Sequence, residues 1–173
     1  MALIATLVVG SNGATSLHGK SSPLSTPSDR ARFLARHRSA AAFIIGKQSA
    51  FIESYDASQV PIFVFSRSNE PLSLPNPLMK QLSVKGSELG EISRNIDQRI
   101  AGDIVVEAGA SLLAAMIAAG VIDVLEISIS PIAGDGHFID LAEILRDFDC
   151  SEVAAEDGTR LLQCRYQGNS ANG

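Results

Sequence analysis

The sequence predicts one α/β domain over residues 1–173, with a mostly parallel central sheet flanked by helices and a carboxyl-terminal antiparallel hairpin. The first observation is that short apolar segments rich in β-branched residues alternate with segments of helical periodicity, as in folds built on parallel strands. The second is the stretch 104–131, which has the pattern strand, glycine turn, helix, strand. The third is a pair of strand-like segments, 150–155 and 159–166, which flank Glu156-Asp157-Gly158.

Composition excludes some classes of partner. Hydrophobic residues make up 46% of the chain, charged residues make up 19%, and the net charge is −5. Without a basic stripe we expect no nucleic-acid partner. Residues 1–9 are apolar, but they lack a basic start and are too short to cross a bilayer, so we expect no targeting or membrane segment.

The two cysteines, Cys150 and Cys164, lie in apolar segments near the end of the chain. They show no CxxC or metal-ligand spacing, so we interpret them as small buried hydrophobic residues and predict no metal site. This interpretation favours a reducing compartment and a cytoplasmic location.

Residues 2–9 predict a first central strand, which ends at Gly10-Ser11-Asn12-Gly13. Residues 16–28 are rich in serine, glycine and proline, which is compatible with a lid or with a simple connection. Thr26 followed by Pro27 is typical of a helix N-cap and first turn, and the helix should run to about residue 38.

That helix is expected to turn Phe33 and Leu34 toward the core. Its arginines are expected to face solvent, with an anionic ligand as the alternative partner: Arg30, Arg32, Arg36 and Arg38.

Three predicted strands end in residues suited to an anion. The strand 41–45 precedes Gly46-Lys47-Gln48-Ser49, the strand 61–65 precedes Ser66-Arg67-Ser68-Asn69, and the strand at 104–106 leads through Glu107 to Gly109. Ligands of open α/β sheets bind at the carboxyl ends of strands, where free helix amides and a guanidinium attract phosphate. Each motif alone is equally compatible with an ordinary polar turn.

The remaining elements follow from periodicity. Residues 80–84 predict a short strand and residues 88–100 an amphipathic helix. A helix that follows Gly109 should stop at Gly120. The strand 121–131 alternates apolar with polar residues and therefore has one apolar and one polar face. Its part 125–129 and the terminal hairpin need cover, which favours a homodimer.

Four segments resemble the reductase domain of riboflavin biosynthesis, the RibD C-terminal domain-like branch of the dihydrofolate reductase-like superfamily. The first is Ser11-Asn12-Gly13-Ala14, with a later Ser25-Thr26-Pro27-Ser28-Asp29-Arg30. The second runs from Arg38-Ser39-Ala40 to Ile45-Gly46-Lys47-Gln48-Ser49. The third joins Val106-Glu107-Ala108-Gly109-Ala110-Ser111-Leu112 to Ala119-Gly120-Val121-Ile122-Asp123-Val124-Leu125. The fourth is Pro131-Ile132-Ala133-Gly134-Asp135-Gly136, and together they extend over nearly the whole chain.

Three positions depart from the family pattern. Asn12 stands where the family usually carries Asp, Gln48 where a second glycine is expected, and Ala108 where the first glycine of Glu-Gly-Gly is expected. A side chain in place of glycine obstructs close approach of a pyrophosphate to the backbone, and Asn12 lacks the charge of Asp.

The resemblance implies a dihydrofolate reductase-like fold, a homodimer and an NADPH-dependent reduction of a phosphorylated ribosylamino-pyrimidine. The implied cofactor-binding residues are Gly46, Lys47, Ser49, Ser66, Arg67, Gly109, Ala110, Ser111 and Leu112. The implied substrate-binding residues are Asn12, Ser25, Thr26, Arg30 and Glu107. Two alternatives remain, another NADPH-dependent reductase of the same superfamily and a non-catalytic dimeric protein that binds a small molecule.

Overall fold

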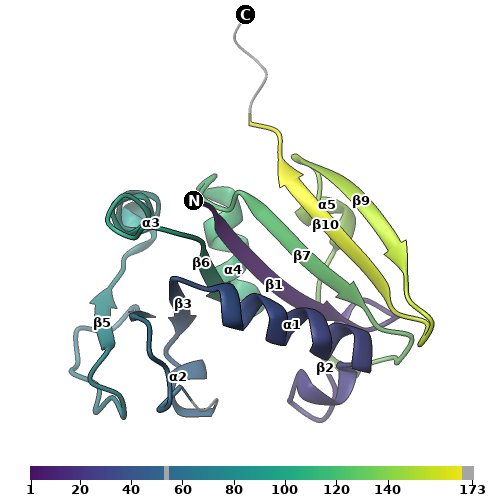
Figure 1. The fold of residues 1–173 in the computed structure, drawn as a ribbon, viewed down its shortest axis with the longest axis horizontal. Coiled ribbons are helices and arrows are strands. Elements are labelled where there is room, and N and C mark those ends of the chain that lie inside the picture. The colour runs from purple at the N-terminus through teal and green to yellow at the C-terminus, as the bar shows by residue number, and fades with distance from the viewer. Residues whose placement is uncertain (53–54, 169–173) are drawn as a thin grey trace, which may run out of the picture. The chain divides into compact units, whose positions relative to one another are not determined.

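A computed structural model of the chain describes residues 1–52 and 55–168 (Figure 1). The chain divides into two compact units, each made of two sequence segments. Unit 1 holds residues 1–5 and 39–121, and unit 2 holds residues 6–38 and those from 122 onward. The strand β1 (Leu3–Val9) belongs to both, because its first part lies in unit 1 and its second part in unit 2.

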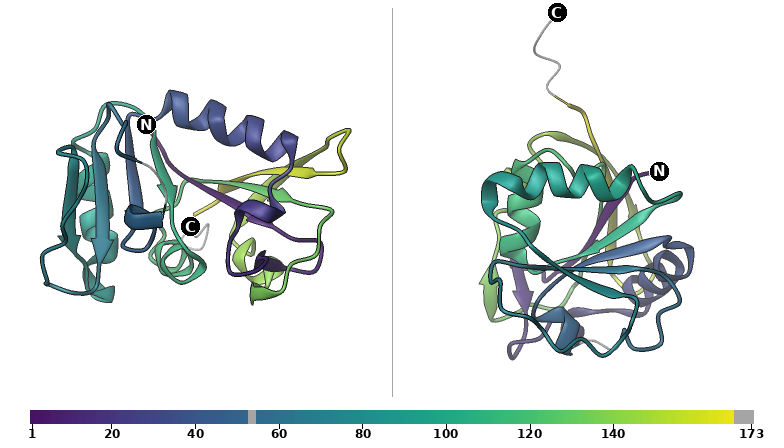
Figure 2. Two further views of the ribbon diagram at one scale, coloured as in Figure 1. Left: turned by 90° about the horizontal axis from the view of Figure 1, so that it is seen from below. Right: turned by 90° about the vertical axis from the view of Figure 1, so that its left-hand side faces the viewer.

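Unit 1 is built on parallel strands. Their order is β5 (Met79–Ser83), β4 (Ile62–Ser66), β3 (Ala42–Gly46), β6 (Ile104–Glu107) and the start of β1. The helices α3 (Leu89–Asp97) and α4 (Ala110–Ala118) lie on one face, and the short α2 (Ser49–Ile52) lies on the other (Figure 2). A 3-10 turn, η2 (Gly86–Glu88), precedes α3. Strands covered on both faces explain the unbroken apolar runs in β3 and β6.

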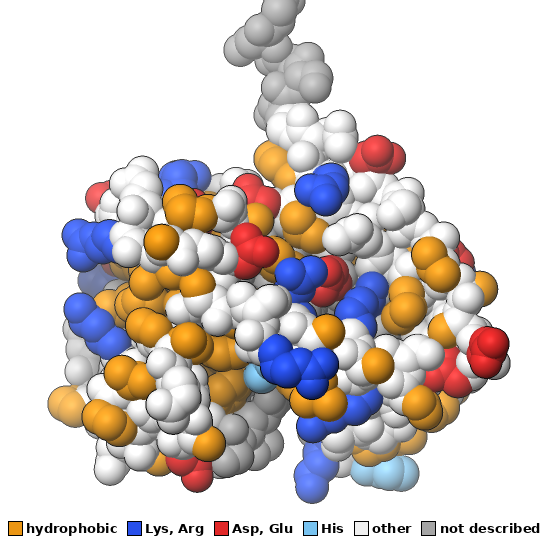
Figure 3. Space-filling view, viewed as in Figure 1, with side chains coloured by type: hydrophobic (Ala, Val, Ile, Leu, Met, Phe, Trp, Pro, Cys, Tyr) orange, Lys and Arg blue, Asp and Glu red, His pale blue; other side chains and the backbone are white. Residues whose placement is uncertain are grey.

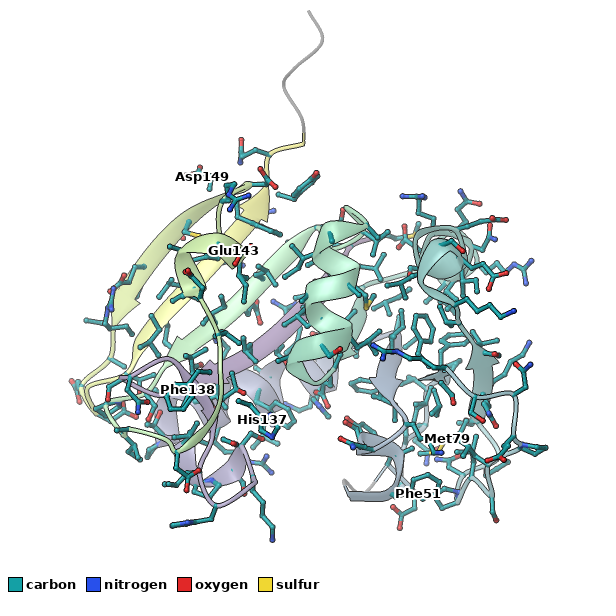
Figure 4. All side chains as sticks on the ribbon, turned by 180° about the vertical axis from the view of Figure 1, so that it is seen from behind. Phe51, Met79, His137, Phe138, Glu143 and Asp149 are labelled. Atoms are coloured by element: carbon teal, nitrogen blue, oxygen red, sulfur yellow. A yellow bond between two sulfur atoms is a disulfide. The ribbon has the colours of Figure 1, made fainter. Side chains whose placement is uncertain are left out.

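The core on the α2 face of unit 1 comes from alternate residues of its strands. Phe43 and Ile45 of β3 lie beside Val64 of β4 and Val105 of β6. Met79 of β5 closes this core, whereas Phe51 of α2 stays exposed (Figure 4).

Unit 2 contains the antiparallel strands. The end of β1 is followed across the sheet by β7 (Val124–Ile129), β10 (Arg160–Tyr166) and β9 (Phe148–Ala154). Its other elements are β2 (Ala14–Ser16), η1 (Ser22–Leu24), α1 (Pro27–Ser39), β8 (Gly136–Phe138) and α5 (Leu141–Ile144). The expected α/β fold with its carboxyl-terminal hairpin is therefore confirmed.

The segment expected to be a long loop after β1 has structure of its own. β2 pairs antiparallel with β8, and Leu24 of η1 is fully buried. Gly134 makes the close pairing possible, because a Cβ on it would lie 2.3 Å from the Ser16 carbonyl oxygen. Short strands of three residues carry too little periodicity to be recognised in the sequence.

The inner face of α1 differs from the expectation. Leu34 is exposed and Phe33 only half-buried, so the prediction that these residues face the core is wrong. Instead the Arg32 guanidinium donates to the Leu162 carbonyl oxygen and the Ser128 hydroxyl, both at 2.9 Å. Arg36 forms a bidentate ion pair with the buried Glu126.

These arginines cover the polar face of β7 within unit 2. Burial lowers the pKa of the Arg32 guanidinium, although the nearby Glu126 and Asp29 raise it. The polar face of β7, which was expected to need cover, is therefore covered by α1 of the same chain.

The interpretation of the cysteines is also wrong. Cys150 of β9 and Cys164 of β10 are directly opposite in register and form a disulfide, with an S–S distance of 2.08 Å and a Cα–Cα distance of 4.0 Å. Cys164 is buried, but Cys150 is exposed. The spacing of two cysteines does not reveal whether they pair. The disulfide removes the ground on which a reducing compartment was inferred, and the cytoplasmic location stays a prediction.

Within residues 1–52 and 55–168, no helix combines the length and the apolar character needed to cross a membrane. Over the same ranges, no three His, Cys, Asp or Glu side chains are grouped so that they could hold a metal ion.

Candidate functional site

The carboxyl ends of three parallel strands lie side by side in unit 1. Gly46 at the end of β3 is opposite Phe65 of β4, and Ile45 is opposite Glu107, the last residue of β6. The residues that follow these strands therefore leave the sheet at one edge. This is the edge that the sequence predicted to hold a ligand.

Helix α4 begins at this edge with an open N-terminus. Its N-cap is Gly109, which provides no side-chain hydrogen bond to the first amides of the helix. A Cβ on Gly109 would find no atom within 4 Å, and one on Gly46 would be 3.8 Å from Cδ2 of Leu112. The first turn, which includes Ala110 and Ser111, therefore has no side-chain cap, and Gly109 and Ser111 are exposed.

A cation lies beside the helix terminus. Arg67, the residue after β4, donates from Nη2 to the Ser111 hydroxyl at 3.2 Å. Arg67 and Lys47 are both exposed. A guanidinium in contact with the first turn of a helix adds its charge to the positive end of the helix dipole, so this edge is suited to an anion.

Two other predicted cofactor residues, Ser66 and Ser49, are less exposed than Arg67 and Lys47. The Ser66 hydroxyl is buried and donates to the Ser68 carbonyl oxygen at 3.2 Å while it accepts from the Ser68 amide at 3.1 Å. It therefore shapes the turn that carries Arg67. Ser49 begins α2 and is half-buried.

Glu107 is buried at the end of β6, with 8% of its surface exposed. The Tyr55 hydroxyl donates a hydrogen bond to Oε2 of Glu107. Sequence analysis did not identify Tyr55, because a single tyrosine in a loop carries no pattern that points to a distant carboxylate.

The other residues expected to bind substrate lie in unit 2. Asn12 uses its whole amide to join two turns: Nδ2 donates to the Gly134 carbonyl oxygen at 2.9 Å, and Oδ1 accepts from the Gly134 amide at 3.0 Å. Oδ1 also accepts from the Ala14 amide at 3.4 Å. Asn12 therefore holds the start of β2 against the turn before β8.

Ser25 and Thr26 lie at the N-terminus of α1. The Thr26 hydroxyl accepts from the Asp29 amide at 3.2 Å and lies 2.5 Å from the Thr159 hydroxyl. The Ser25 hydroxyl donates to the Asp29 carboxylate. The expected N-cap at Thr26 is thus confirmed, and Ser25 holds the carboxylate of a first-turn residue.

A second capping group comes from the hairpin turn. Asp157 accepts from the Ser28 amide at 2.8 Å and from the Thr159 amide at 3.1 Å. The side-chain hydrogen bond from Thr159, followed by the backbone hydrogen bond from Ser28, holds the pKa of Asp157 well below its usual range.

Arg30 lies on the outer side of α1 with its guanidinium carbon 5.2 Å from the centre of the Phe33 ring. Lys and Arg side chains gather over this helix in Figure 3. Arg30 is exposed, so its guanidinium is accessible to an anion from solvent.

Comparison with known proteins gives matches to solved structures only. No family model matches the sequence, and no curated protein matches it. Dihydrofolate reductase from Enterococcus faecalis, in complex with NADP(H) and RAB-propyl, superposes with a TM-score of 0.68 at 14% identity over 96% of each chain. The chain has a dihydrofolate reductase-like fold.

Other proteins with the dihydrofolate reductase-like fold come from riboflavin biosynthesis. A protein of Shewanella sp. PV-4 assigned to that pathway has a TM-score of 0.70 at 14% identity, over 96% of this chain and 99% of that one. A diaminohydroxyphosphoribosylaminopyrimidine deaminase/5-amino-6-(5-phosphoribosylamino)uracil reductase from Thermotoga maritima has a TM-score of 0.70 at 15% identity. That match covers 95% of this chain and 56% of the Thermotoga protein, so the chain spans about half of the two-activity enzyme.

Proposed function

We propose that this protein is an NADPH-dependent reductase that resembles 5-amino-6-(5-phosphoribosylamino)uracil reductase. The observation that carries the proposal is the contact of Arg67 with Ser111 beside the uncapped N-terminus of α4. The fold supports it, because a protein of this fold has been solved with NADP(H) and another is a reductase of a phosphoribosylamino-pyrimidine.

The residues at the carboxyl ends of β3, β4 and β6 are suited to NADPH. The space in front of Gly109 lets a pyrophosphate approach the amides of Ala110 and Ser111, and a Cβ at Gly109 would fill part of that space. Arg67 and Lys47 supply positive charge for the ribose phosphate, with Ser66 fixing the turn that presents Arg67. The remaining members of the proposed set line the same edge: Gly46, Ser49 and Leu112.

NADPH supplies the hydride when it is bound, so the protein needs to bind and orient the reactants and to exclude water. We assign these tasks to the edge residues of unit 1 for the nucleotide. We assign substrate contacts to Glu107, Asn12, Ser25, Thr26 and Arg30. The capping and turn contacts of Asn12, Ser25 and Thr26 then also fix the backbone that carries them.

The test is the oxidation of NADPH, followed by its absorbance, with 5-amino-6-(5-phosphoribosylamino)uracil as substrate. We expect oxidation that depends on this substrate. Binding of NADPH without turnover of this pyrimidine would favour another reductase of the same fold. Absence of NADPH binding would favour the non-catalytic alternative, in which the departures at Asn12, Gln48 and Ala108 have abolished cofactor binding.

We also propose that the protein is a homodimer. The strand β9 lies at the edge of its sheet and is exposed along nearly all of its length, with Val153 at 66% exposure. Phe138 of β8, in the same unit, is 61% exposed (Figure 4). Open edges and exposed apolar side chains are commonly covered by a second copy. Sedimentation at micromolar concentration should show a dimer, and Val153→Lys should shift it toward monomer; a wild type that sediments only as monomer would refute the proposal.

A further inference from the structure

Glu107 and Tyr55 form a buried polar contact next to the proposed nucleotide site. Tyr55 has 4% of its surface exposed, and its hydroxyl donates to Oε2 of Glu107. Glu107 is separated from the N-cap Gly109 only by Ala108. A buried carboxylate is costly unless hydrogen bonds compensate it, so this contact favours one orientation of the Glu107 side chain.

The position of Tyr55 is itself fixed by the core of unit 1. Its ring centre is 5.8 Å from that of Phe43. The buried Asn76 donates from Nδ2 to the carbonyl oxygens of Tyr55 at 2.9 Å and of Asp56 at 3.1 Å. Oδ1 of Asn76 accepts from the Leu78 amide at 2.8 Å. Contacts other than the hydrogen bond to Glu107 thus fix both the backbone and the ring of Tyr55.

We propose that Tyr55 is a positioning residue that orients the Glu107 carboxylate to receive hydrogen bonds from the substrate. The inference rests on the proposed function and deepens it, because a carboxylate accepts hydrogen bonds and therefore selects a ligand that donates them. An exocyclic amine, a ring N–H or a ribose hydroxyl of a ribosylamino-pyrimidine meets that requirement.

The experiment measures the Kd of 5-amino-6-(5-phosphoribosylamino)uracil by calorimetry without NADPH, so that no turnover is needed. The proteins are wild type, Tyr55→Phe, Glu107→Gln and the double variant. Tyr55→Phe keeps the ring on Phe43 and removes only the donor. Tyr166→Phe is the matched control, because Tyr166 packs on Phe148 in unit 2.

We expect Tyr55→Phe and Glu107→Gln each to weaken pyrimidine binding by roughly tenfold, the loss of about one hydrogen bond. The double variant should bind no more weakly than the weaker single variant, since Tyr55 acts on the pyrimidine only through the Glu107 carboxylate. The Kd of NADPH should not change in Tyr55→Phe, and this separates positioning of Glu107 from general damage to unit 1. Tyr166→Phe should match wild type in both affinities.

Wild-type pyrimidine affinity in Tyr55→Phe would overturn the inference and leave the proposed function intact. Effects that multiply in the double variant would overturn it too, as would a parallel loss of NADPH affinity in Tyr55→Phe. A wild type that binds NADPH but not the pyrimidine would overturn the proposed substrate and the inference with it. If Tyr55→Phe does not fold, Asn76→Ser, which weakens the support of Tyr55, takes its place with the same expected pattern.

Discussion

The amide of Asn12 has a structural use in this protein, at a position where the family that the sequence resembles usually carries a charged Asp. Both of its polar atoms bind the backbone of Gly134. Aspartate would keep the acceptor, lose the donor and place a carboxylate oxygen against the Gly134 carbonyl oxygen. The amide is therefore the better residue for this contact.

We predict that Asn12→Asp lowers stability by about 1 kcal/mol, or roughly 2–4 °C in Tm. Thermal unfolding at pH 7 measures it. Asn69→Asp is the matched control, because Asn69 accepts a hydrogen bond from Ser83 through Oδ1 and aspartate retains that acceptor. Equal stability of Asn12→Asp and wild type would show that the amide contact with Gly134 is not needed.

The carboxylate of Asp157 makes the stability of the capped N-terminus of α1 depend on pH. Its pKa is depressed in the folded protein, so its contribution to stability is present above the unfolded value of about 3.9 and is lost as the pH falls through the folded value. Asp157→Asn should therefore be less stable than wild type at pH 7, and the difference should shrink below about pH 4.

The measurement is Tm against pH for wild type, Asp157→Asn and the control Asp149→Asn, which removes the same charge from an exposed position of β9 (Figure 4). A constant gap between wild type and Asp157→Asn across the acid range would argue against this carboxylate as an ionised cap.

Among single residues, the positions of those at the end of a strand or the start of a helix could be predicted from the sequence. Gly109, Arg67 and Ser111 follow buried strands or begin a helix, so their meeting at one edge could be predicted. Tyr55 could not, because its contact with Glu107 joins residues 52 positions apart through a loop. The disulfide could not be predicted either, because the hairpin was predicted without its register, and it is the register that places Cys150 opposite Cys164.

At the scale of elements, α1 packs through arginines because the face of β7 that it covers is polar. Its most buried charge contact is the bidentate pair of Arg36 with Glu126. Removal of one partner leaves the other charge buried and uncompensated.

We predict that Arg36→Ala destabilises the protein by about 3 kcal/mol, which lowers Tm by roughly 6–12 °C. Arg38→Ala, at an exposed position of the same helix, should lie within about 0.5 kcal/mol of wild type. Urea unfolding of both variants provides the comparison. If the two variants unfold at the same midpoint, the polar packing of α1 contributes little to stability.

Periodicity predicted which segments form helices and strands, but it did not predict how these elements pack against one another. The strands at β3, β4 and β6 and the helix α1 were predicted close to their observed bounds. The inner face of α1 was misassigned because apolar residues were assumed to face the sheet, whereas the polar residues of β7 select arginine instead. The three-residue strands β2 and β8 depend on a tertiary approach at Gly134 that local sequence does not encode.

At the scale of the whole molecule, each of the two compact units combines two separate segments of the sequence, and β1 contributes to both. The proposed nucleotide residues all lie in unit 1, whereas the proposed substrate residues other than Glu107 lie in unit 2. Because the proposed nucleotide residues lie in unit 1, nucleotide binding can be tested by substitutions in unit 1 alone, in the intact chain. A single domain over residues 1–173 stays a prediction.

The most direct test of the account is the ratio of the NADH and NADPH dissociation constants, measured by fluorescence titration of wild type and Arg67→Ala. A charge-assisted contact of Arg67 with the ribose phosphate is worth about 1.5–3 kcal/mol, so wild type should prefer NADPH by roughly ten- to a hundred-fold. Arg67→Ala should lose most of that preference, and Arg99→Ala, which removes an exposed arginine elsewhere in unit 1, should retain it. An unchanged ratio in Arg67→Ala, or a wild type that binds neither nucleotide, would contradict a nicotinamide nucleotide site at the edge formed by β3, β4 and β6.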